Sequence, residues 1–150
     1  MLKKIVMVLL VCMWTAAFSF ADDLYFEGWS VWGGLKAAPK GNTVTLNGKV
    51  NVAGYVTADI NTALRNKTVF LEIRNAENSV FTDGRLLKIY VNKDDRLIQP
   101  LNVSSLIFKE YIPASCTLIE FVLPSDFDGK MGFVFYQTEL KDLKITAKYK

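Results

Sequence analysis

Histidine is absent from the 150 residues of the sequence. Catalytic triads that use an imidazole, metal sites with imidazole ligands and histidine acid–base chemistry are therefore excluded. The sequence also lacks a strong excess of positive or negative charge, because it has 18 Lys and Arg residues and 15 Asp and Glu residues. Proteins that bind nucleic acid concentrate positive charge, so we expect no nucleic-acid partner.

Cysteine is also scarce, with two in the chain. Cys12 lies in the N-terminal segment described below, and Cys116 alone cannot form an intramolecular disulfide, so the fold must depend on its hydrophobic core. The apolar run at residues 5–14 is shorter than the roughly 20 residues that a membrane-spanning helix needs. With 51% hydrophobic and 22% charged residues, the composition indicates a globular domain without a membrane span.

Residues 1–21 have the three parts of a secretory signal peptide. Two lysines form a basic start, residues 5–14 form an apolar middle, and small residues lead to Ala21. We expect cleavage after Ala21, which leaves residues 22–150 as a single mature domain. The predicted location is secreted, periplasmic or at the cell surface.

No sustained helical periodicity occurs after residue 23. Apolar and polar residues alternate instead, in short segments rich in Val, Ile, Phe, Tyr and Thr that Gly, Pro, Asn and Asp interrupt. The predicted strands are residues 24–29, 43–46, 49–52, 54–60, 68–74, 86–92, 106–112, 117–123, 131–137 and 143–149. We expect an all-β fold, a two-sheet antiparallel β-sandwich of the jelly-roll type.

Two connections are also predicted. Residues 61–65 are expected to form one helical turn. Asn47 and Gly48 indicate a hairpin turn between two strands. A two-residue loop would place the apolar residues of the two strands on opposite faces, whereas a three-residue loop would keep them together. The register at this turn stays open.

Three predicted strands each turn one aromatic residue away from the core, beside polar or charged neighbours. The outward sets are Tyr55, Thr57 and Asp59; Phe70, Glu72 and Arg74; and Lys88, Tyr90 and Asn92. Tyr136 and Glu120 are further candidates for the same surface. The C–H face of a pyranose stacks on aromatic rings, and its hydroxyls accept and donate hydrogen bonds to such polar groups. One interpretation is a shared sugar-binding face; the other is that the rings pack across strands.

Trp29 and Trp32 lie in a segment that contains Gly28 and is followed by Gly33 and Gly34. One interpretation places both near a ligand, and another has one of them close the end of the sandwich. We prefer Trp32 for ligand binding, because Gly33 and Gly34 are expected to leave open space beside it.

Several segments resemble the jelly-roll carbohydrate-binding modules that accompany xylanases and glucanases, within the galactose-binding-like sandwiches. These segments are Phe26-Glu27-Gly28-Trp29, Ile119-Glu120-Phe121-Val122-Leu123-Pro124, Phe133-Val134-Phe135-Tyr136 and Leu140-Lys141-Asp142-Leu143-Lys144-Ile145. The resemblance implies a jelly-roll fold that binds a polysaccharide or other glycan without catalysis and requires no cofactor for it. It also implies a structural calcium ion held with the help of Glu27 and Asp142. The family often has paired aspartates where this chain has Lys141 before Asp142.

The leading hypothesis is a secreted, non-catalytic glycan-binding module. Its candidate ligand-binding residues are Trp29, Trp32, Tyr55, Phe70, Glu72, Arg74, Tyr90, Asn92 and Tyr136. The alternative is a structural or protein-interaction sandwich of the cell envelope, with a protein partner and no sugar ligand. Without histidine, an enzyme would need a pair of carboxylates, for which Glu72 and Glu120 are the candidates. We expect no enzymatic activity.

Overall fold

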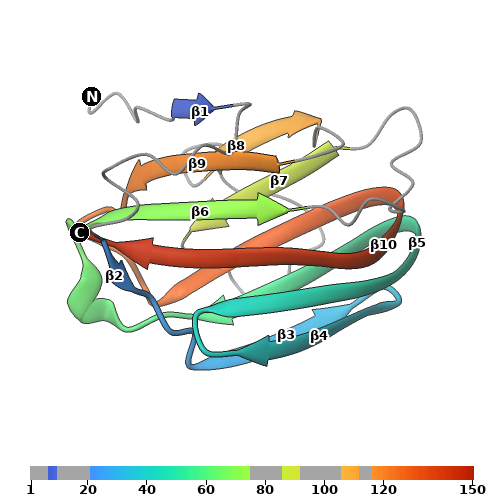
Figure 1. Ribbon diagram of the computed structural model, residues 1–150, viewed down its shortest axis with the longest axis horizontal. Coiled ribbons are helices and arrows are strands. Elements are labelled where there is room, and N and C mark those ends of the chain that lie inside the picture. Colours follow the sequence, from blue (N-terminus) through green and yellow to red (C-terminus); the bar gives the residue numbers. More distant parts are fainter. Residues whose placement is uncertain (1–6, 10–20, 75–85, 92–105, 112–115) are drawn as a thin grey trace.

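The computed structural model of the chain is built almost entirely of antiparallel β-strands (Figure 1). It describes residues 7–9, 21–74, 86–91, 106–111 and 116–150. The strands are β1 (Met7–Leu9), β2 (Asp22–Asp23), β3 (Gly28–Trp32), β4 (Leu35–Lys40), β5 (Thr43–Asp59), β6 (Thr68–Arg74), β7 (Leu86–Val91), β8 (Leu106–Tyr111), β9 (Cys116–Val122) and β10 (Lys130–Tyr149). A 3-10 helix, η1 (Thr62–Leu64), confirms the predicted helical turn.

Two long strands, β5 and β10, form the frame of the molecule. They pair with each other from Lys130 and Asp59 at one end to Thr146 and Thr43 at the other. Both strands double back on themselves, so that each runs through both layers of the sandwich (Figure 1). In the first layer, called the β7 layer, the order is β3, β5, β10, β7, β8; in the second, the β6 layer, it is β4, β5, β10, β6, β9, β1.

Irregularities in β10 allow it to turn from one layer to the other. The register shifts between Tyr136 and Thr138 and again between Leu140 and Leu143. At these points Gln137 and Asp142 adopt left-handed backbone conformations, with φ of 43° and 51°. A bulge inserts an extra residue and bends the strand. The side chains directed at the core therefore change parity twice along β10, which alternation alone did not predict.

The predicted turn at Asn47 and Gly48 is wrong, because both residues lie inside the continuous strand β5. Gly48 has a φ of 136°, and a Cβ atom there would collide with the Gly34 carbonyl oxygen of the neighbouring chain segment. The glycine thus serves a close approach of two backbones rather than a hairpin. Because β5 is continuous, the question of a hairpin register at this position does not arise. Val44 and Val50, which lie on either side of the predicted turn, both face the core.

One hydrophobic core fills the space between the layers. In β6 and β7 the inward residues are those that alternation predicts: Val69, Leu71, Ile73, Leu87, Ile89 and Val91. Phe127, Phe133 and Phe135 are fully or almost fully buried among them. Burial of alternate residues from both layers in a single cluster is the defining property of a sandwich. The predicted fold class, an antiparallel two-sheet β-sandwich of the jelly-roll type, is confirmed.

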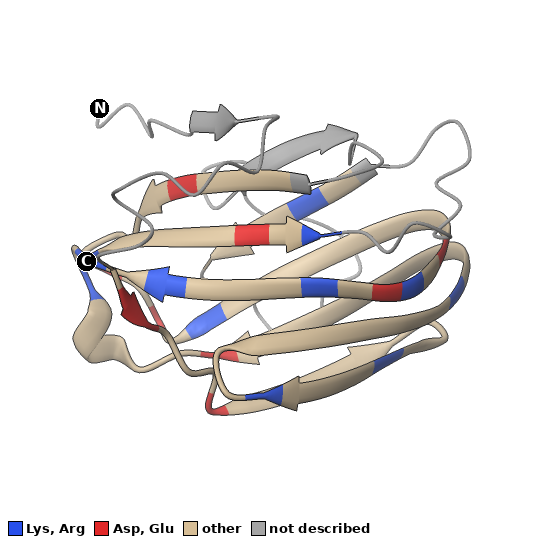
Figure 2. Cartoon of the chain, viewed as in Figure 1, with Lys and Arg blue, Asp and Glu red and all other residues tan. Residues whose placement is uncertain are grey.

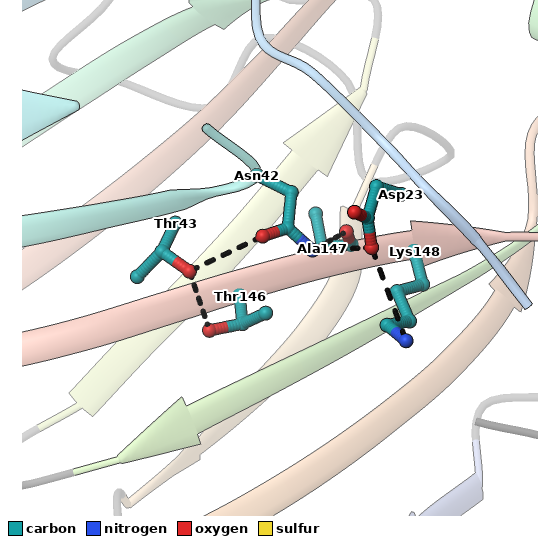
Figure 3. A network of polar contacts seen from close by, with 6 residues as sticks. All are labelled: Asp23, Asn42, Thr43, Thr146, Ala147 and Lys148. Carbon is teal, nitrogen blue, oxygen red and sulfur yellow. Dashed lines mark hydrogen bonds and ion pairs between the residues drawn. The ribbon is translucent and has the colours of Figure 1, made fainter. Parts of the chain in front are cut away.

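The start of the described domain departs from the predicted strand at residues 24–29. Residues 24–27 lie outside strands, while Leu24 is fully buried in the core. Polar contacts hold this segment to the last strand (Figure 3). The Asn42 side chain donates hydrogen bonds from Nδ2 to Asp23 Oδ1 and to the Ala147 carbonyl oxygen, each at 3.0 Å. Lys148 Nζ lies 3.9 Å from Asp23 Oδ1, so backbone pairing and side chains together fix the two segments.

The N-terminal segment contributes one described strand, β1, which pairs with the outer edge of β9. Its register places Met7 beside Glu120 and Leu9 beside Leu118. None of the helices within the described residues is long and apolar enough to cross a membrane. Cleavage after Ala21 stays a prediction.

Candidate functional site

The outer face of the β7 layer gathers aromatic side chains from four strands. In β5, β7 and β10 the core takes alternate residues, including Val56, Ile89 and Phe133, so the residues between them point away from the core. We call this surface the tyrosine face. It is defined by Trp32, Tyr55, Lys88, Tyr90, Val134 and Tyr136.

Strand register arranges four of these side chains in one row. Trp32 of β3 pairs with Tyr55 of β5, Tyr55 with Val134 of β10, and Val134 with Lys88 of β7. The Trp32 and Tyr55 rings are stacked, with centroids 5.8 Å apart and an interplanar angle of 24°. Tyr55 is buried, whereas Trp32 is 53% exposed. A buried ring therefore supports an indole that remains open to a ligand.

The other end of the row combines a cation with two phenols. Lys88 Nζ lies 5.0 Å from the centroid of the Tyr136 ring, within the range of a cation–π contact. Tyr90 is only 2% exposed, and with Val134 and Tyr55 it forms a small apolar cluster against which Tyr136 packs. Burial, with a smaller contribution from Tyr136, raises the pKa of Tyr90 to about 12. The Tyr90 phenol is thus neutral at physiological pH.

A second row lies beside the first, and an ion pair lies beyond it. Ser30, Thr57, Gly132 and Tyr90 follow one another across β3, β5, β10 and β7. Gly132 has no side chain, so backbone forms the surface between Thr57 and Tyr90. Two residues further along the strands, Lys130 Nζ lies 3.1 Å from Asp59 Oδ1. The tyrosine face thus offers rings, hydroxyls and charges within a few strand spacings.

Phe70, Glu72 and Arg74 do not join this face. Their strand, β6, pairs with the second part of β10 and belongs to the other layer, because the bend in β10 separates the strands that pair with its two halves. Figure 2 shows acidic and basic residues close together on β6 and the adjacent part of β10. We call this second outer surface the ionic face. It is defined by Phe70, Glu72, Arg74, Lys144, Thr146 and Lys148.

Contacts within the ionic face leave less for a ligand. Arg74 Nε donates to Glu72 Oε1 at 2.6 Å, and the Glu72 side chain is only 10% exposed. Phe70 is buried and clusters with Leu118, and Ala21 packs against the pair. The sequence predicts one common surface for Phe70, Tyr55 and Tyr90. This prediction is wrong for Phe70, because its strand β6 belongs to the other layer.

The carboxylate pair considered for an enzyme lies on the ionic face side of the β6 layer. Phe70 pairs with Glu120, and Glu72 pairs with Leu118, so the two glutamates are diagonal neighbours on adjacent strands. Glu72 already forms an ion pair with Arg74. Asn92, another predicted binding residue, lies outside the described residues.

The two tryptophans point in opposite directions. Trp29 packs against the core and beside Phe26, at a centroid distance of 4.6 Å, and its buried Nε1 has no hydrogen-bond partner among the residues that the structure describes. Trp32 faces outward, as preferred. The reason given for that preference is wrong, because Gly33 and Gly34 press against β5: a Cβ atom on either would lie 2.5 Å from a backbone oxygen. These glycines permit a tight turn and do not create open space.

Glu27 lies at one end of the paired strands β5 and β10, whereas Asp142 lies at the second register shift of β10. Glu27 N donates to the carbonyl oxygen of Asp59, where β10 begins. Asp142 lies at the bend of β10, where it accepts a hydrogen bond from Asn47 Nδ2 at 3.2 Å. No group of three or more Cys, Asp or Glu side chains suited to a metal occurs in the described ranges. Glu27 and Asp142 do not come together here, and the calcium ion that the resemblance implies stays a prediction.

Sequence reasoning also missed part of the tyrosine face. Val134 and the contact between Lys88 and Tyr136 depend on which side of residues 131–137 faces the core. That segment is apolar on both sides, with Phe133 and Val134 each buried. Alternation in residues 86–92 placed Lys88 outward, but only strand pairing brings it to Tyr136.

Carbohydrate-binding modules are among the solved structures that this chain resembles, as the sequence predicts. One, from the β-sandwich superfamily, is 11% identical with a TM-score of 0.44; the match covers 87% of this chain and 62% of that one. A CBM4 module is 14% identical, with a TM-score of 0.40 and coverage of 81% and 86%. A C-terminal family 22 module from Clostridium thermocellum is 11% identical, with a TM-score of 0.41 and coverage of 87% and 90%.

No protein-family model and no curated protein matches the chain. Identities this low, with TM-scores below 0.5, do not transfer a ligand to it. The chain also spans less than two thirds of the first structure that it resembles. The choice of a function therefore depends on the residues of the tyrosine face.

Proposed function

We propose that residues 22–150 bind a glycan on the tyrosine face, without catalysis. The observation that carries this proposal is the half-exposed Trp32 indole stacked on the buried Tyr55 ring. A rigid, supported indole loses little conformational freedom when a sugar ring stacks on it. An exposed indole on a flat sheet otherwise has an unfavourable contact with water, which a ligand would relieve.

The polar groups of the face suit the rim of a sugar. Hydroxyls of Ser30 and Tyr136 and the Lys88 ammonium can donate hydrogen bonds, and hydroxyl and carboxylate oxygens can accept them. Ring stacking with a few polar contacts is the usual composition of a small-ligand site. The carboxylate beside the face, Asp59, is paired with Lys130, and we propose no catalytic role for it. A glycan-binding role also agrees with export, which rests on the predicted signal peptide.

Isothermal titration of the mature domain against soluble β-glucans, xylan and galactans tests the proposal. We expect binding to at least one class, and Trp32→Ala should weaken it by about 1 to 3 kcal/mol, the usual range for a desolvated aromatic anchor. Tyr25→Ala is the matched control, because Tyr25 is 60% exposed but lies outside the strands of the face. Flat titrations with every glycan, or equal losses for both variants, would contradict the proposal.

A second candidate function is a protein-binding surface in the cell envelope. It is favoured by Val122, which is 58% exposed and lies on the same side of β9 as Leu118. A pull-down from envelope extract, repeated with Val122→Lys, tests it. Loss of a captured protein with glycan binding intact would assign the two functions to different layers.

A further inference from the structure

The outer edge of the sandwich that β3 and β4 form differs between its two halves. Both strands pair with β5 on one side, and no strand pairs with their other side in the part of the chain that the structure describes. They form the lower boundary of the molecule in Figure 1. The β4 half contains Lys36, Pro39 and Lys40, and lysine and proline are residues that prevent edge-to-edge pairing. The β3 half has no charged residue and no proline.

The unprotected β3 half is open to solvent. Ser30 is exposed, Val31 is 37% exposed and Trp32 is 53% exposed. Backbone N–H and C=O groups of an antiparallel strand point alternately to its two sides, so about half of those in β3 are directed away from β5. Because Tyr55 stacks on the β5 side of Trp32, the other face of the indole is directed at this edge. The edge thus offers hydrogen-bonding groups and an apolar ring to another strand.

The sequence of β3 is complementary to itself in antiparallel register. A two-fold axis at Ser30 places Trp32 of one copy opposite Gly28 of the other, on the same face of the sheet. Gly28 has no side chain that would obstruct an indole. The carboxylate of Asp59 leans over this glycine, since its Oδ2 lies 2.7 Å from where a Cβ atom of Gly28 would be. An indole N–H is a hydrogen-bond donor and a carboxylate an acceptor, so the two groups suit each other.

We propose that β3 pairs with β3 of a second copy of this chain, so that one antiparallel sheet runs through the β7 layers of both copies. The interface has two-fold symmetry, and each contact therefore occurs twice. Each Trp32 indole packs over the partner's Gly28, and no like charges meet within the paired strands. The inference does not depend on the proposed glycan-binding function, although a glycan and the second copy would compete for the same face of the indole.

Light scattering after size-exclusion chromatography, over a range of protein concentrations and without glycan, tests the inference. We expect an equilibrium between monomer and dimer. Ser30→Lys brings two ammonium groups together at the two-fold axis and should raise the dissociation constant of the dimer by roughly tenfold or more. Ser30→Glu should do the same. An equimolar mixture of the two variants should associate again, because opposite charges then meet at the axis. Ala38→Lys, at an exposed position of β4, is the matched control and should leave dimerisation unchanged.

The outcomes separate this inference from the proposed function. A protein that is monomeric at every concentration would overturn the inference and leave glycan binding untouched. A dimer that Ser30→Lys does not weaken, or that Ala38→Lys weakens equally, would also overturn it, because the interface would then lie elsewhere. Recovery of the dimer in the mixture excludes misfolding as the cause of the loss, and far-UV circular dichroism checks each variant alone. Two folded variants that do not associate with each other would contradict the antiparallel register at Ser30.

Discussion

On the tyrosine face, Trp32 and Tyr55 stack across neighbouring strands and leave half of the indole in solvent. On the ionic face, the aromatic residue Phe70 is buried against Leu118, and its charged neighbours Glu72 and Arg74 bind each other. Both faces come from strands with the same pattern, one aromatic residue among polar ones. In both faces the aromatic residue of the pattern is buried, and only the tyrosine face adds an exposed ring, that of Trp32 from the neighbouring strand β3.

The difference between the faces originates in the bend of β5 and β10. Each of these strands presents one half to each layer, so β7 pairs with the first part of β10 and β6 with the second. Tyr90 and Phe70, which look equivalent in the sequence, therefore acquire different neighbours. Aromatic residues lie beside Tyr90, whereas Lys148 and Glu120 flank Phe70.

The largest effect is expected from a substitution in the hydrophobic core that both faces share. Phe133 is fully buried between the layers, and Phe133→Ala should lower the free energy of unfolding by about 3 to 5 kcal/mol, because a cavity remains in the core. Urea unfolding followed by far-UV circular dichroism and by tryptophan fluorescence should give coincident transitions. Val52→Ala, at a position 75% exposed, is the control and should change stability by less than about 0.5 kcal/mol. Separate transitions would mean that the faces do not share one core.

A second test concerns the turn that positions Trp32. Gly33 and Gly41 both have positive φ angles, 74° and 61°, but only Gly33 is pressed against backbone atoms of β5. Gly33→Ala should therefore cost about 2 to 3 kcal/mol, and Gly41→Ala about 1 kcal/mol from backbone strain alone. Urea titration of both variants measures the difference. Equal losses would show that the close approach to β5 does not stabilise the tyrosine face.

A third test uses the buried phenol of the tyrosine face. Since the pKa of Tyr90 is raised from 10.0 to about 12, the folded protein favours the neutral phenol. Its contribution to stability is complete below pH 10 and is lost as the pH rises from about 10 to about 12. Tyr90→Phe should reduce this pH-dependent loss by up to about 2 kcal/mol. The measurement is urea unfolding at pH 9 to 12, with Tyr25→Phe as the substitution at an exposed tyrosine, and identical pH profiles for wild type and Tyr90→Phe would refute the prediction.

The smallest effect is expected on the ionic face. Arg74 is about half exposed, and solvent screens its attraction to Glu72, so Arg74→Ala should cost about 1 kcal/mol or less and the cost should shrink at high salt. Lys141→Ala gives a comparison, because in the wild type Lys141 Nζ lies 4.0 Å from Glu139 Oε1 and both side chains are half exposed. Thermal unfolding at low and high salt measures both variants. A larger loss for Lys141→Ala would show that distance and burial do not rank these ion pairs.

Much of the fold could be predicted from local pattern. Residues 68–74 match β6 at both ends, residues 86–92 and 106–112 each extend one residue beyond the end of the observed strand, and residues 117–123 are shifted by one residue from β9. In residues 68–74 and 86–92 aliphatic residues recur at every second position, which only one orientation toward a core satisfies. Alternation of apolar and polar residues did not predict the strands correctly where they bend. Asn47 and Gly48 have the composition of a turn, yet the close approach of Gly34 makes them part of β5.

The candidate site could be predicted less well, because it depends on pairing between distant segments. Sequence reasoning selected Trp32, Tyr55, Tyr90 and Tyr136, which the structure brings to one face. It also selected Phe70, Glu72 and Arg74, which lie in the other layer. Glu27 and Asp142 were selected through the resemblance of short segments, and such a resemblance does not determine how far apart two residues lie in the fold.

The sequence by itself determined that this chain is all-β and which side of most strands faces the core, because period-two alternation depends only on residue spacing and hydrophobicity. Only the tertiary structure decided which outward residues become neighbours. Two bulges in β10, at Gln137 and Asp142, send its halves into different layers, and a bulge is a local backbone conformation that leaves no periodic trace in the sequence. The tyrosine face beside Trp32 forms because that bend groups Tyr55, Tyr136 and Lys88 and places Phe70 in the other layer.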